Sequence, residues 1–113
     1  MSSENLHEKV ESLSKETLDF HRAYMSVKEE IEAIDWYNQR IDAVDDDSLK
    51  KILAHNRNEE MEHACMMLEW IRRHSSEWQE RMDTYLFTEE PIAELEPEEK
   101  RESGDKNLNI GKL

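Results

Sequence analysis

Apolar residues recur at alternating steps of three and four through the first part of the chain, which is the spacing of a stripe along one face of a helix. A stripe of this kind needs a second helix packed against it. The pattern therefore predicts a helix from about Leu6, after a flexible N-terminus over residues 1–5. The stripe consists of Leu6, Val10, Leu13, Thr17, Phe20, Tyr24, Val27, Ile31, Ile34, Asn38 and Ile41.

A second helix is expected from about Ser48 to about His74. The run Asp45–Asp47 ends the first pattern, and its short acceptor side chains suit the N-terminus of a following helix. So short a connection predicts an antiparallel two-helix hairpin. The second stripe reads Leu49, Ile52, Leu53, Asn56, Glu60, His63, Met67, Trp70 and His74.

The chain changes character after this hairpin. Ser75 and Ser76 predict a break, and the residues that follow predict a short third helix ending near Phe87, so that residues 6–87 form one helical domain of the all-α class. Residues 88–106 are acidic and contain both prolines, which is typical of a disordered tether. Residues 107–113 restore apolar positions, which is typical of a docking peptide.

Composition indicates that this helical domain works with partner chains. Only 36% of the 113 residues of the chain are hydrophobic and the mean hydropathy is −0.99, so a single chain has little to bury. The net charge of −13 favours cations as ligands and disfavours nucleic acid. No apolar run is long enough for a signal peptide or a membrane span, and Cys65 has no partner for an internal disulfide, so we expect a cytoplasmic protein without a membrane partner.

Candidate chemistry centres on Glu60 and His63, which share one helix face at a spacing of three residues. Both fall on the predicted apolar stripe, where an unpaired carboxylate is costly and needs a cation or a network. Glu30 flanks the stripe of the first helix. A two-metal carboxylate centre in a helical bundle uses a Glu from each of two helices and a Glu-x-x-His from each of two others. One chain supplies half of that set, which predicts a dimer that forms a four-helix bundle with the centre at its interface.

The ligand types narrow the choice of metal. Carboxylates with one imidazole per ion suit iron or manganese, and the lack of paired cysteines argues against a structural zinc site. Iron is our first expectation, as a di-iron centre, and manganese, zinc and calcium are further ions that we expect the site to accept. Oxygen ligands favour ferric over ferrous iron, which predicts a ferroxidase. The alternative is a non-catalytic metal-binding scaffold or cargo protein whose polar interface fixes the register of a helical assembly.

Three segments together resemble the encapsulated ferritin family: residues 29–37 (EEIEAIDWY), 55–63 (HNRNEEMEH) and 68–73 (LEWIRR), with residues 85–88 (YLFT) extending the likeness. The resemblance implies an antiparallel dimer with a ferroxidase centre, and dimers joined in a ring, commonly a decamer. It also implies residence inside an encapsulin nanocompartment that stores the iron mineral, with residues 107–113 as the peptide that targets the protein to the encapsulin shell.

The resemblance also implies roles for individual residues. Glu30, Glu60 and His63 correspond to the centre, Glu29 and Glu32 to acidic positions associated with metal entry, and Trp36 and Tyr37 to aromatic positions beside the centre. Simpler interpretations stand beside these. The three glutamates of the first helix could form an ordinary solvated face, and the two aromatic residues could be packing residues, as Cys65 could be.

Overall fold

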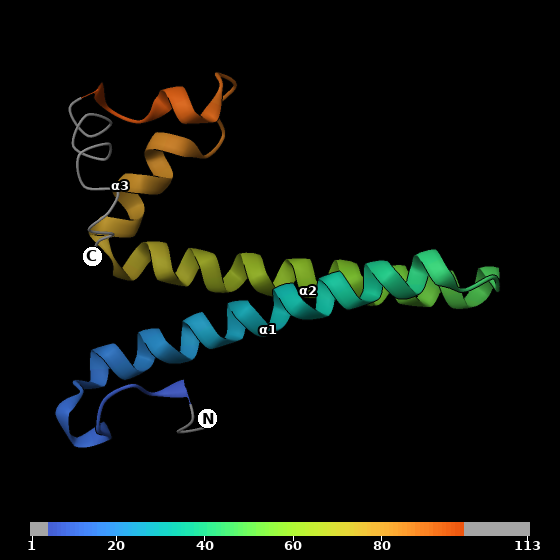
Figure 1. Cartoon of the computed structure of the whole chain (residues 1–113), viewed down its shortest axis with the longest axis horizontal. Helices are drawn as coiled ribbons and strands as arrows, with labels where there is room; N and C mark the ends of the chain where they lie inside the picture. The colour runs from blue at the N-terminus through green and yellow to red at the C-terminus, as the bar shows by residue number, and fades with distance from the viewer. Residues whose placement is uncertain (1–4, 99–113) are drawn as a thin grey trace. The chain divides into compact units, whose positions relative to one another are not determined.

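Residues 5–98 are described by the computed structural model, and they contain helices and no strand (Figure 1). The all-α prediction is therefore confirmed. The chain divides into two units, one up to His74 and one from Ser75 onward. No helix within 5–98 combines the length and the apolar character that crossing a lipid bilayer requires.

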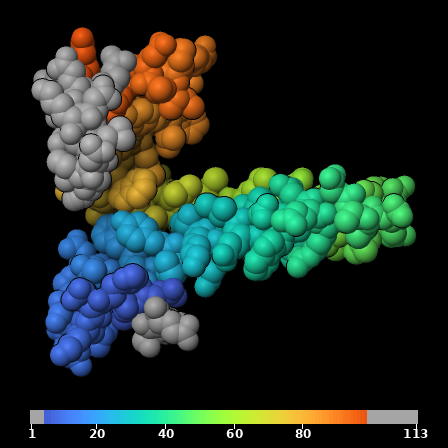
Figure 2. Space-filling view, viewed as in Figure 1, coloured from blue at the N-terminus to red at the C-terminus, as the bar shows by residue number. Residues whose placement is uncertain are grey.

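The first unit is an antiparallel hairpin of two long helices, α1 (Lys15–Ala43) and α2 (Asp47–His74), preceded by a short 3-10 helix, η2 (Val10–Ser12). The helices run beside each other and meet at a connection of three residues (Figure 1). Their side chains meet along the hairpin in the space-filling view (Figure 2). The predicted two-helix hairpin is confirmed.

The start of α1 differs from the prediction of about Leu6. Ser14 has an extended backbone, and its hydroxyl oxygen accepts a hydrogen bond from the Thr17 N–H at 3.0 Å, so it caps the helix and fixes its first residue as Lys15. The apolar spacing of Leu6, Val10 and Leu13 fits a helix, but the local capping interaction ends the pattern. At the other connection, Asp46 caps α2 by accepting from the Leu49 N–H at 2.8 Å, as the acidic run predicts.

The face of α1 that packs against α2 also differs from the predicted stripe. Ala23 is buried on it, and Glu30 is half-buried between Val27 and Ile34, whereas Ile31 of the predicted stripe is 56% exposed. Ala23 and Ala64 are both buried on the packed faces of their helices, and Ile31 lies outside the packed face of α1. The two facing rows are Ala23, Val27, Glu30, Ile34, Tyr37 and Ile41 on α1, and Leu53, Arg57, Glu60, Ala64, Met67 and Ile71 on α2.

The hairpin has a thin apolar core. Only Ala23, Ala64 and Ile71 are buried among residues 5–98. Toward the ends of the helices, Phe20 of α1 contacts Trp70 of α2 edge to face, with ring centroids 5.4 Å apart. Large apolar side chains remain exposed on both helices, including Tyr24, Ile31, Trp36, Leu49, Ile52, Met61, Met66 and Leu68. A chain that leaves this much apolar surface open favours association with other chains.

The second unit contains α3 (Ser76–Tyr85) and a 3-10 helix, η3 (Ile92–Leu95), which contact each other. Ser75 caps α3, as the predicted break required. The helix ends two residues before Phe87, whose φ of 59° is left-handed and cannot continue it. The regular turn of η3 lies in the stretch predicted as a disordered tether, because Pro91 presets a turn there. Residues 99–106 of the tether and the docking peptide 107–113 lie outside the described residues.

Candidate metal centre

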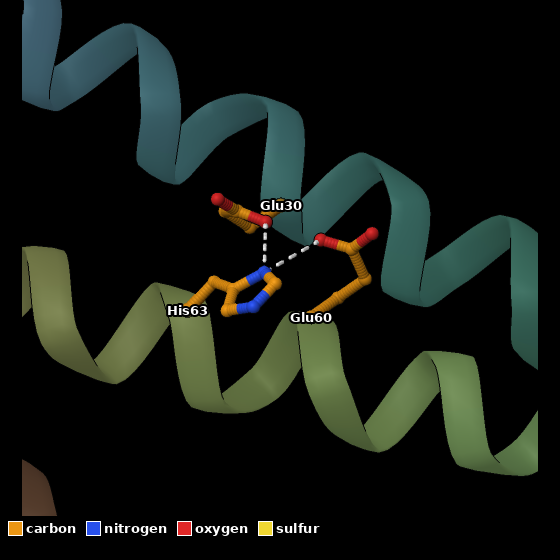
Figure 3. A group of neighbouring side chains, drawn as sticks. All are labelled: Glu30, Glu60 and His63. Carbon is orange, nitrogen blue, oxygen red and sulfur yellow. Dashed lines mark ion pairs between the residues drawn. The ribbon is translucent and has the colours of Figure 1, made fainter.

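Glu30, Glu60 and His63 come together in the middle of the hairpin. Glu30 projects from α1, and Glu60 and His63 project from successive turns of α2 into the space between the helices (Figure 3). One donor atom from each side chain lies within 4.8 Å of the others. The Nδ1 atom of His63 is 3.7 Å from a Glu30 oxygen and 3.6 Å from a Glu60 oxygen. The cluster therefore combines two oxygen donors and one nitrogen donor around one small volume.

The local sequence explains why these side chains meet. Glu30 and Glu60 both occupy positions in the two facing rows, so packing of the hairpin points them at each other. His63 follows Glu60 by three residues and lies beside it on the rim of the same face. The prediction that Glu60 and His63 are buried holds only in part for the single chain, because their side chains are 28% and 47% exposed. Glu30 is the most covered of the three at 20%.

The two carboxyl groups affect each other electrostatically. A hydrogen bond with Glu60 is the main cause that raises the pKa of Glu30 above its ordinary value, and partial burial and the charge of Glu60 raise it further. The charge of His63 opposes this shift. Glu30 thus holds a proton more tightly than a solvated carboxyl group, and a cation that binds between the two carboxylates would compete with a proton for Glu30.

The donor set fits a divalent ion of the first transition series. Ligand distances in such sites are about 2.0–2.2 Å, so small rotations of these side chains would be enough to close them around an ion. The three donors leave coordination positions open. Two copies of the cluster would supply the four carboxylates and two imidazoles of a two-metal centre in a helical bundle. The assignment of these residues as metal ligands remains a prediction.

The other predicted residues lie outside this cluster. Glu29 and Glu32 are exposed on α1, and Glu29 acts on the cluster only through its charge, which raises the pKa of Glu30. Trp36 is 52% exposed and shares no described contact with the three ligand candidates. Tyr37 lies in the facing row of α1, where the guanidinium of Arg40 covers its ring at 5.4 Å from the centroid. The roles of these four residues remain predictions.

Arg57 is a neighbour of the cluster that the sequence analysis missed. Its Nη1 donates a hydrogen bond to Oδ1 of Asn38 on α1 at 3.0 Å, which links the two helices beside the cluster. Its spacing of three residues from Glu60 was a signal that could have identified it, since oppositely charged residues at that spacing interact on a helix surface.

Comparison with known proteins places the chain in a family. Residues 5–89 match the family described as EncFtn-like. The encapsulated ferritin-like protein of Rhodospirillum rubrum is 57% identical over 95 residues, which cover 84% of this chain and 68% of that protein. The encapsulin nanocompartment cargo protein EncC of Myxococcus xanthus is 41% identical over 49 residues, 43% of this chain and 38% of that protein. A crystal structure of protein ne0167 from Nitrosomonas europaea, 54% identical, superposes with a TM-score of 0.76 over 79% of this chain and 98% of that one.

Proposed function

The chain belongs to the EncFtn-like family of encapsulated ferritins, and from this premise we propose that it is a ferroxidase that oxidises Fe(II) to Fe(III) with dioxygen at a centre completed by a second copy of the chain. The observation that supports the proposal most is the cluster of Glu30, Glu60 and His63, since a ferritin-like activity needs a set of oxygen and nitrogen donors between helices. Ferrous iron is the substrate. Two ferrous ions give up one electron each, and one dioxygen takes up these two electrons and two protons to form hydrogen peroxide.

Charge balance explains why two chains are needed. One chain offers two carboxylates, and two chains offer four, which offset the four positive charges of two ferrous ions. After oxidation the ions carry six positive charges against the same four carboxylates. The excess of two positive charges favours the binding of hydroxide to the ferric ions.

The residues of the chain have distinct tasks in this scheme. Glu30 and Glu60 hold ferrous iron through oxygen atoms, which stabilise the ferric state and so make the electron easier to remove. His63 contributes a neutral nitrogen and adds no further negative charge.

Oxidation of ferrous iron by purified variants tests the proposal. Ferrous iron is added without oxygen, air is admitted, and formation of ferric iron is followed by absorbance. Glu60→Ala and His63→Ala are expected to lose the oxidation observed with the unmodified protein, while Glu62→Ala, an exposed residue on the same helix, retains it. Oxidation that survives Glu60→Ala would contradict the proposed centre. Binding of iron without oxidation would instead favour the non-catalytic metal-binding scaffold.

Assembly can be tested on the same samples. Elution volume in size-exclusion chromatography, with and without ferrous iron, should indicate dimers and larger rings, with a decamer as the expected closed form. Glu60→Ala should reduce association that depends on iron, because each chain then offers too few donors to a shared ion. An unchanged elution volume for all variants with and without iron would contradict a centre shared between chains.

We also propose that the protein works inside an encapsulin nanocompartment in the cytoplasm, where it supplies iron for mineral storage. The support is the family and the relative from Myxococcus xanthus, which is an encapsulin nanocompartment cargo protein. Residues 107–113 are the proposed targeting peptide. Their deletion should abolish co-purification with the encapsulin shell and leave iron oxidation intact. Loss of oxidation in the truncated chain, or continued co-purification, would contradict this role.

A further inference from the structure

Arg57 stands where an ion pair with Glu60 would be expected. The two residues lie three positions apart on α2, in the row that faces α1, so their side chains can reach each other. Both are half-buried, which strengthens the attraction between opposite charges relative to bulk water. If the Arg57 guanidinium paired with Glu60, it would compete directly with a metal ion for the Glu60 oxygens.

Another glutamate on α2 shows how arginine side chains can occupy both oxygens of a carboxylate. Glu69 accepts hydrogen bonds from Arg72 at 2.7 and 2.8 Å and from Arg73 at 2.6 Å. These two guanidinium groups lower its pKa to about 2. Both Glu69 oxygens are thus engaged by arginine, and a carboxylate bound in this way has little left to offer a metal ion. In that example Glu precedes Arg, which is the more favourable order, but the reverse order still permits the pair.

Arg57 instead binds two neutral amides. Its Nη1 donates to Oδ1 of Asn38 at 3.0 Å, and its Nε donates to Oδ1 of Asn58 at 3.3 Å. Within residues 5–98, the basic side chain that approaches a Glu60 oxygen is His63, whose Nδ1 lies 3.6 Å away, and not Arg57. Asn38 is nineteen positions away in the sequence and on the other helix, so this hydrogen bond forms only when the hairpin is folded.

We propose that Asn38, assisted by Asn58, is a positioning residue that holds the Arg57 guanidinium away from Glu60 and so keeps the Glu60 carboxylate open to a divalent cation. The inference rests on the proposed function for the metal cluster and adds to it a residue outside the ligand set. Neutral amides suit this task, because they bind the guanidinium without adding a competing negative charge near the cluster.

Removing Asn38 should therefore weaken metal binding through Arg57. In Asn38→Ala the guanidinium loses its partner on α1 and turns to Glu60. The cost to metal affinity equals the strength of a partly exposed ion pair, which corresponds to a loss of about two- to five-fold. In an Arg57→Gln background the competing charge is gone, and Asn38→Ala should have no measurable effect.

Titration with cobalt(II), followed by its visible absorbance and by calorimetry, measures this without relying on turnover. The full chain is compared with Asn38→Ala, Arg57→Gln and the double variant. Gln39→Ala is the matched control, because Gln39 is the next residue on α1 and bonds only to exposed Asp35. The expected result is a loss of affinity in Asn38→Ala alone, with recovery in the double variant to the affinity of Arg57→Gln.

Three outcomes would overturn the inference. If Asn38→Ala lowers the affinity for cobalt equally in the unmodified chain and in Arg57→Gln, the role of Asn38 is a structural one in helix register. Unchanged affinity in Asn38→Ala, when Glu60→Gln abolishes cobalt binding, would refute the role of Asn38 and leave the proposed function standing. Failure of the unmodified protein to bind cobalt at Glu60 and His63 would refute the proposed function and the inference together.

Discussion

Replacing Glu60 by glutamine should make the metal-free protein more stable while removing its stabilisation by metal. Glu30 and Glu60 place two carboxylates within 4.8 Å of each other in the hairpin. Two unit charges at this distance repel by about 1 kcal/mol in water and by about 3 kcal/mol at an effective dielectric constant near 20. The substitution removes one charge, and the introduced amide can still donate a hydrogen bond to Glu30.

The expected gain in the free energy of unfolding lies in the lower part of that range. Proton sharing already relieves some of the repulsion in the unmodified protein, since the hydrogen bond with Glu60 raises the pKa of Glu30. We therefore expect the free energy of unfolding of the metal-free protein to rise by about 1 to 2 kcal/mol, or about 5 °C or more in Tm for a domain of this size. With metal present the unmodified protein should be the more stable of the two. The variant lacks a metal ligand, so metal no longer stabilises its native state.

The pH dependence provides a second test. Between the ordinary carboxyl value of 4.5 and the raised pKa of Glu30, the native state binds more protons than the unfolded state. The metal-free protein therefore loses stability as pH rises through this interval, and Glu60→Gln avoids that loss. The stability difference between the two proteins should be small below the interval and should widen as pH increases above it.

Urea unfolding followed by circular dichroism, in chelator and in cobalt(II), at several pH values, measures both effects. Glu62→Gln is the control, because it removes one charge from an exposed position on α2. A Glu60→Gln protein that is less stable than the unmodified one in chelator, or a difference that does not change with pH, would refute the reasoning. A gain of equal size in Glu62→Gln would indicate an effect of net charge and not of the carboxylate pair.

Three further predictions concern the hairpin that holds the cluster. Ile71→Ala should lower the free energy of unfolding by about 2 to 4 kcal/mol in urea, because Ile71 is 2% exposed and its removal leaves a cavity. Ser14→Ala should cost about 1 kcal/mol and increase amide hydrogen exchange in the first turn of α1, because it removes the cap. Glu69→Gln should lower Tm at neutral pH. Since its pKa is depressed from 4.5 to about 2, the difference in Tm should disappear as pH falls through that interval.

Each of these has a result that would contradict it. Val10→Ala is a matched control for Ile71, since its exposed side chain should leave stability within about 0.5 kcal/mol, and an equal loss in both would argue against a core at Ile71. Unchanged exchange at the start of α1 in Ser14→Ala would mean that other contacts hold that turn. For Glu69→Gln, a Tm difference that persists below pH 2 would show that the arginine pairs are not its source.

The sequence predicts the elements of this fold well and their facing surfaces less well. Periodicity and capping residues locate the hairpin, because both act within a few residues. They do not reveal that Ala23 and Glu30 face α2 while Ile31 faces outward, because α1 has two adjacent stripes of similar apolar character. The choice between the stripes depends on how closely two helices approach, which is a tertiary property. The predicted start of α1 is wrong because the cap at Ser14 sets the first residue of the helix, although the apolar spacing of residues 6–13 fits a helix.

The sequence predicts the metal-ligand candidates better than it predicts the contacts of the residues around them. A Glu-x-x-His spacing is a local feature, and with Glu30 on a second helix it is enough to indicate half of a two-metal centre. The contact between Arg57 and Asn38 joins residues on different helices and depends on their register, so it was not accessible from one helix at a time.

The small core of the hairpin has a consequence for the lifetime of a newly made chain. With Ala23, Ala64 and Ile71 as the only buried side chains in residues 5–98, an isolated chain has little free energy separating it from unfolded forms that proteases cleave. Association would cover the exposed apolar side chains of both helices and slow that cleavage. Turnover by proteolysis would then remove chains that have not found a partner, so that the population which survives is the population able to share a metal ion.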